Sequence, residues 1–115
     1  MADLTVYEKP TCTTCRQLFD LLEERGIDAE RVDYHVTGLT EEQIRDLLAK
    51  AGAAPLDFVR AREPAYVELV AGRNLSDDDL IAVMAEHPEL VQRPIVVRGD
   101  RAVLARPVER VLELL

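Results

Sequence analysis

The chain has 115 residues, 48% hydrophobic and 31% charged, which is the balance of a globular protein folding as one domain. A formal net charge of −8 disfavours general nucleic-acid binding, and no apolar run is long enough to span a bilayer. The N-terminal Met1-Ala2-Asp3 lacks the basic and apolar regions of a signal peptide, so we expect a cytoplasmic protein without a membrane partner.

The N-terminal part predicts a strand, a helix and a second strand. Leu4 to Tyr7 form a short apolar run typical of a buried strand, and apolar residues at helical spacing follow from about Thr14 to Arg25. Residues 31–34 fit a second strand, which would complete a right-handed crossover unit.

The middle of the chain, from Thr40 to roughly Val91, gives only helical signals. Capping residues at Thr40 and Ser76 and a proline at Pro64 mark the starts of three helices in this segment. The absence of any alternating apolar pattern predicts a helical block between two groups of strands.

The C-terminal part returns to strands. Pro94 to Val97 predict one strand, Gly99-Asp100 a tight turn, residues 102–104 the returning strand, and Val108 to Leu115 a closing amphipathic helix. The whole order is that of a thioredoxin-like α/β fold. We therefore expect one domain over residues 1–115, with a four-stranded mixed sheet and a helical insertion at about 40–91, between strands two and three.

Both cysteines of the chain, Cys12 and Cys15, lie where the first strand turns into the first helix. Backbone N–H groups there lack intrahelical partners and the helix dipole is positive, so a thiolate or a bound oxyanion is favoured. A thiol pKa in such a place can fall from about 8.5 into the range of roughly 3.5 to 7.5. The spacing favours redox or nucleophilic chemistry over a structural bridge or two buried thiols.

Strand pairing predicts two arginines beside this loop. If the third strand pairs antiparallel with the first, its start lies at the edge where the first strand ends, and the fourth strand returns there. Arg93 precedes the third strand and Arg106 follows the fourth, so both are expected to form an oxyanion site with the helix terminus. Arg98, near the hairpin turn, is expected at the opposite edge, and Arg62 is not assigned to the site.

Other polar and aromatic residues receive structural interpretations. His35 and His87, with the two cysteines, fit no zinc-finger or zinc-ribbon spacing, so no metal site is predicted. Tyr34 is interpreted as part of the strand core.

Four segments of the chain resemble the glutaredoxin-coupled arsenate reductase family: Lys9 to Arg16, Phe58 to Arg60, Glu86 to Val97, and Ala105 to Pro107. The resemblance covers essentially the whole chain, in order and at matching spacing. It implies reduction of arsenate to arsenite, with Cys12 as nucleophile and no bound cofactor. It also implies that Arg60, Arg93 and Arg106 bind the oxyanion, and it is the only reason to include Arg60.

The resemblance also implies supporting roles for three residues. Lys9 and Arg16 flank the cysteine loop, although a solvated ion pair with Asp20 is the simplest role for Arg16. Pro94 is expected to follow a cis peptide bond, which would turn the backbone toward the cysteine loop.

Two positions depart from the family pattern. Many members have a serine where Cys15 stands, and glutathione supplies their second thiol. Here Cys15 is close enough to form an internal disulfide with Cys12, so glutaredoxin with glutathione, or thioredoxin, is the expected reductant. The best-known members have a histidine where Glu8 stands. An inward carboxylate would raise the pKa of Cys12 unless Lys9, Arg16 and the helix terminus compensate; otherwise Glu8 points to solvent.

Two other functions stay open. The C-x-x-C pair and the Arg-Pro-Ile step also resemble Spx-type regulators, which bind the C-terminal domain of the RNA polymerase α-subunit. Those regulators generally lack the arginine corresponding to Arg106. Gly52 matches a glycine that they use in this contact, although a helix C-cap is its simpler role. The third candidate function is that of a general thiol-disulfide oxidoreductase without an oxyanion substrate.

Overall fold

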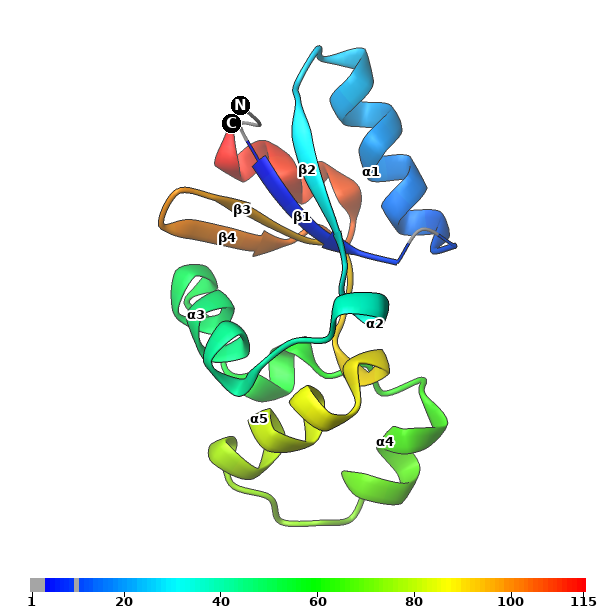
Figure 1. Cartoon of the computed structure of the whole chain (residues 1–115), viewed down its shortest axis with the longest axis vertical. Coiled ribbons are helices and arrows are strands. Elements are labelled where there is room, and N and C mark those ends of the chain that lie inside the picture. The colour runs from blue at the N-terminus through cyan, green and yellow to red at the C-terminus, as the bar shows by residue number, and fades with distance from the viewer. Residues whose placement is uncertain (1–3, 10) are drawn as a thin grey trace.

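The described part of the chain contains one mixed sheet with strand order β2-β1-β3-β4 (Figure 1). The computed structural model describes residues 4–9 and 11–115. Its strands are β1 (Leu4–Glu8), β2 (Ala29–Asp33), β3 (Ile95–Arg98) and β4 (Arg101–Leu104). β1 pairs in parallel with β2 and antiparallel with β3, which pairs antiparallel with β4. The predicted thioredoxin-like α/β sheet is confirmed.

Helices pack on both faces of this sheet. Helix α1 (Thr13–Glu24) and the 3-10 helix η3 (Val108–Leu114) accompany the strands in the upper half of Figure 1. The helical insertion between β2 and β3 contains α2 (Tyr34–Thr37), α3 (Glu41–Ala51), η1 (Pro55–Phe58), α4 (Pro64–Leu69), α5 (Asp77–Glu86) and η2 (Pro88–Leu90). Within the described residues, no helix has the length and apolar character needed to cross a bilayer.

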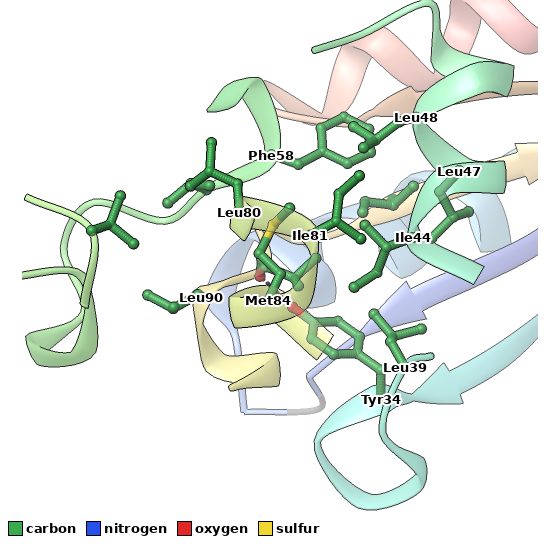
Figure 2. Packing of buried hydrophobic residues seen from close by; sticks show 14 residues of the cluster. Tyr34, Leu39, Ile44, Leu47, Leu48, Phe58, Leu80, Ile81, Met84 and Leu90 are labelled. Atoms are coloured by element: carbon green, nitrogen blue, oxygen red, sulfur yellow. Dashed lines mark hydrogen bonds between the residues drawn. The ribbon is translucent and has the colours of Figure 1, made fainter. Parts of the chain in front are cut away.

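Two hydrophobic clusters stabilise these layers by removing apolar surface from water. On one face, Leu4 and Val6 of β1 pack with Leu18 and Leu22 of α1 and with η3. On the other, Ile95 joins the cluster that α3 and α5 form inside the insertion, with Ile44, Leu47, Ile81 and Met84 among its buried members (Figure 2). The insertion is therefore continuous with the core of the sheet.

Local capping explains where helix α3 begins and ends. Thr40 and Gln43 form the predicted reciprocal capping box, with hydrogen bonds of 3.0 and 2.9 Å. Gly52 ends the helix in the left-handed region at φ 62°, which a residue without Cβ adopts at little cost. The C-cap role of Gly52 is thus confirmed.

The prediction that Tyr34 belongs to a strand was wrong. Tyr34 begins α2, because the side chain of Asp33 accepts a hydrogen bond from the His35 N–H and starts a helical turn there. The Tyr34 hydroxyl donates to the carbonyl of Val91 at 2.6 Å, so it ties α2 to the segment that leads into β3. The insertion therefore begins before Thr40.

Replacing Tyr34 by phenylalanine should lower the free energy of unfolding by about 1–3 kcal/mol, because the buried Val91 carbonyl loses its donor. Denaturant titration measures this loss. Tyr66→Phe is the matched control, since the partly buried Tyr66 makes no side-chain hydrogen bond to a described residue. Equal losses in the two variants would contradict this role of the Tyr34 hydroxyl.

Candidate active site

Cys12 stands at the N-terminus of α1, where its backbone is extended at φ −79° and ψ 125°. The Cys12 N–H donates to the Lys9 carbonyl at 2.9 Å and closes the loop. The Cys12 carbonyl accepts from the Arg16 N–H at 3.1 Å and opens the helix. The half-exposed Cys12 thiol therefore lies at the positive end of the helix dipole, while Cys15 is buried.

The Cys12 loop borders a pocket of about 400 Å³. This volume lies within the roughly 300–1,000 Å³ that is usual for small-molecule sites. Three threonines and five cationic side chains line it with Cys12; the cations are Lys9, Arg60, Arg62, Arg93 and Arg106. No acidic residue is among the described residues of this lining. The pocket therefore concentrates positive charge in a chain whose net charge is −8.

The hairpin of β3 and β4 delivers Arg93 and Arg106 to this pocket. Ile95, at the start of β3, pairs with Tyr7 near the end of β1 and with Leu104 at the end of β4. Arg106 Nη1 donates to the Arg93 carbonyl at 2.9 Å, which links the two arginines. The peptide bond between Arg93 and Pro94 is cis, as predicted, and the Arg106–Pro107 bond is also cis.

Arg60 reaches the pocket through a single β-bridge inside the helical insertion. Val59 pairs antiparallel with Val91, and the Arg60 N–H donates to the Leu90 carbonyl at 2.6 Å. This bridge holds Arg60 beside the segment that continues into Arg93. A one-residue bridge leaves no alternating pattern, so strand topology did not place Arg60.

Arg62 also lines the pocket, although it was not assigned to the site from the sequence. It lies two positions beyond Arg60 and follows the same bridge into the pocket. Arg60 itself is anchored, because its Nε donates to Glu63 Oε1 at 3.1 Å. The exposed Arg62 has no comparable signal in the sequence, which explains why it was missed.

Arg93 is a buried cation that faces the cysteine loop. Only 5% of its surface is exposed, and its Nε and Nη1 atoms have no hydrogen-bond partner among the described residues. Burial lowers the pKa of Arg93, but the neighbouring Tyr34 hydroxyl and Cys12 sulfur more than offset this and raise it. A buried guanidinium with unused donors is suited to bind an anion.

The surroundings shift the pKa values of the two cysteines in opposite directions. Burial raises the pKa of Cys12, but hydrogen bonds from the Cys15 N–H, the Cys15 thiol and the Arg93 guanidinium together hold it below its ordinary value. Burial, with the negative charge of a Cys12 thiolate, raises the pKa of Cys15 to about 12. These surroundings favour the Cys12 thiolate more than an ordinary site does, and they keep Cys15 protonated.

The remaining predicted residues are placed as follows. Lys9 lines the pocket, whereas Arg16 is exposed on α1 and is not among the described residues that do so. Glu8 points inward, not to solvent, with 3% of its surface exposed. Arg98 donates to the carbonyl of Leu114 at 2.7 Å, away from the pocket. Residues 4–9 and 11–115 contain no group of three or more His, Cys, Asp or Glu side chains placed to hold a metal ion.

Comparison with known proteins gives one family. A sequence model of the ArsC family matches residues 7–114. The chain is 35% identical over 113 residues to an arsenate reductase of Neisseria meningitidis serogroup B, covering 96% of this chain and 97% of the relative. An Escherichia coli protein named uncharacterized protein YfgD is 38% identical over 111 residues, which cover 95% and 93%. The solved structure of an arsenate reductase from Vibrio cholerae has a TM-score of 0.93 and 39% identity, covering 100% of both chains.

The pH dependence of Cys12 alkylation with iodoacetamide measures whether the pKa of this thiol is lowered. The midpoint should lie below that of an ordinary thiol, and Cys15→Ala should raise it, because the variant loses the thiol that donates to Cys12. Cys15→Ser is the matched control, since its hydroxyl can still donate. Identical midpoints in the two variants would show that the Cys15 side chain does not stabilise the thiolate.

Proposed function

The chain belongs to the ArsC family, and we propose that it reduces arsenate to arsenite with Cys12 as its nucleophile. One observation carries this proposal: a thiol of lowered pKa borders a pocket lined by five cationic side chains. A general disulfide reductase needs the thiols and gains from one cation that lowers the Cys12 pKa, but it does not require four further cations around the pocket. Reduction of a tetrahedral oxyanion needs both the reactive thiol and the positive charge that binds the anion.

In this proposal the arginines bind arsenate and offset its negative charge. Arg93 has free donors in a buried position, where an electrostatic interaction is stronger than in water. Arg60 and Arg106 line the same pocket, and they are held by Glu63 and by the Arg93 carbonyl. Arg62 and Lys9 add positive charge at the rim. Because these groups are in place before substrate arrives, little reorganisation opposes the reaction.

The first chemical step is attack of the Cys12 thiolate on arsenic. A sulfur–arsenic bond forms, and an arsenate oxygen leaves as water after taking up protons. Arsenic stays in the As(V) state, and the covalent intermediate still carries oxygens that the arginines can bind. The helix N-terminus stabilises the same negative charge.

Cys15 would complete the reduction. It lies three residues after Cys12 in the first turn of α1, close enough for the two sulfurs to interact and for an internal disulfide to form. Glutaredoxin with glutathione, or thioredoxin, would then reduce this disulfide. No prosthetic group takes part in this scheme, because both electrons come from the two sulfur atoms.

We expect purified protein, supplied with a thiol-regenerating system, to oxidise NADPH only when arsenate is present. Cys12→Ser should abolish this turnover, because the thiolate that attacks arsenic is lost. The measurement is the decrease in NADPH absorbance with and without arsenate. No arsenate-dependent turnover, or equal turnover in Cys12→Ser and in the wild type, would contradict arsenate reduction through Cys12.

Arg93→Ala should lower kcat/KM for arsenate by about 10²–10³-fold, the range expected for loss of one donor to a charged transition state. Arg98→Ala is the matched control, because Arg98 binds the Leu114 carbonyl and does not line the pocket. Steady-state kinetics compare the two. Disulfide reductase activity that needs no arsenate and is unaffected by Arg93→Ala would favour the general oxidoreductase instead.

A further inference from the structure

A buried carboxylate, Glu8, lies at the end of β1, near enough to the buried thiol of Cys15 for its charge to raise the pKa of that thiol. Every second residue of β1 is buried, and this series ends at Glu8. The buried stripe of α1 begins at Cys15 and continues through Leu18 and Leu22. Since α1 returns along the strand that precedes it, the end of β1 meets the start of α1 (Figure 1). Glu8 is 3% exposed and Cys15 is 0% exposed.

The surroundings of Glu8 leave its charge only partly compensated. Burial raises the pKa of Glu8; Arg31 of β2 lowers it, and Asp33 of β2 raises it. The Arg31 Nε lies 3.7 Å from Glu8 Oε1, and Arg31 is also held over the ring of Phe19 on α1. In β3, the uncharged Ile95 pairs with Tyr7, the residue before Glu8.

We propose that Glu8 accepts the proton of Cys15 when the Cys15 sulfur attacks Cys12. The inference deepens the proposed function, because it names the group that activates the second thiol. In the arsenate reaction, the Cys15 proton moves to a Glu8 carboxylate oxygen, and the two sulfurs form a bond. The sulfur–arsenic bond breaks, its electron pair stays on arsenic, and arsenic leaves as As(III) in arsenite. The two sulfurs together lose the two electrons that arsenic gains.

Charge conservation inside the core supports this assignment. If Cys15 lost its proton to solvent, the thiolate would be a second anion beside the Glu8 carboxylate in a region that water hardly reaches. Transfer to Glu8 keeps one negative charge in the core and only moves it from oxygen to sulfur. The negative charge of Glu8 contributes to the raised pKa of Cys15. Protonation of Glu8 removes this charge and so makes the Cys15 thiol easier to ionise.

The test uses dithiobis-nitrobenzoate, which needs no arsenate. In a first phase, the reactive Cys12 thiolate forms a mixed disulfide with one half of the reagent and releases the other half as a coloured thiolate. Attack by Cys15 then displaces the bound thiol in a second phase and forms the disulfide between Cys12 and Cys15. Stopped-flow absorbance follows both phases, and Cys15→Ser should show the first phase only.

The wild-type rate of the second phase should become independent of pH above the pKa of Glu8, because the carboxylate is then ready to accept the proton. In Glu8→Gln this rate should fall about 10²-fold near neutral pH, the lower end of the range for a positioned base. It should also rise about tenfold per pH unit between about pH 6 and 9, since only the small thiolate fraction reacts. Glu8→Asp should restore the flat profile in part.

A role for Glu8 as a neighbouring charge alone predicts the opposite change in the rate of the second phase. If Glu8 is only a neighbouring charge, Glu8→Gln lowers the pKa of Cys15 and makes the second phase faster, which would overturn the proposal. Asp20→Asn removes an exposed carboxylate from α1 and should leave both phases unchanged. An unchanged first phase in Glu8→Gln shows that its fold and its Cys12 are intact.

Arg31→Gln provides a second test that does not remove Glu8. Without Arg31 the pKa of Glu8 rises, so the pH at which the second phase levels off should move upward. An unchanged profile would also overturn the proposal. Because the reagent replaces arsenate, failure of arsenate turnover leaves this inference standing, and a wrong pH profile leaves the proposed function standing.

Discussion

The contact between the Arg93 guanidinium and the Cys12 sulfur is the interaction on which the rest of the site depends. Arg93 is buried with unused donors, which is costly unless an anion lies nearby. Cys12 is partly buried, which disfavours its thiolate unless a cation lies nearby. Each group offsets the cost of the other, so the buried guanidinium and the neighbouring thiolate stabilise one another.

The fold makes this contact by joining three distant parts of the chain at one edge of a sheet. The β1–α1 turn brings Cys12, the hairpin brings Arg93 and Arg106, and the Val59–Val91 bridge brings Arg60. Tyr34 ties the start of the insertion to the same segment. The helical insertion therefore does more than fill space, because it supplies part of the positive charge around the thiol.

Much of this arrangement follows from sequence patterns, and the exceptions have physical reasons. Strand pairing alone places Arg93 and Arg106 near Cys12, because their positions depend only on which ends of the strands meet. Arg60 depends on a one-residue bridge with no periodic pattern, so only the family resemblance suggested it, and Arg62 was missed altogether. Alternation along β1 favours an inward Glu8, but the rule that charged residues avoid the core points the other way. Tyr34 was assigned to a strand because its Asp33 cap was not recognised.

The most direct test of the central claim is a crystal structure of the Cys15→Ser protein treated with arsenate, with arsenic located by its anomalous scattering. Without the second thiol, the reaction should stop at the covalent intermediate. We predict arsenic bonded to the Cys12 sulfur, with its oxygens facing Arg60, Arg93 and Arg106. Arsenic bound elsewhere, or a free Cys12 beside a pocket that binds no oxyanion, would contradict the account.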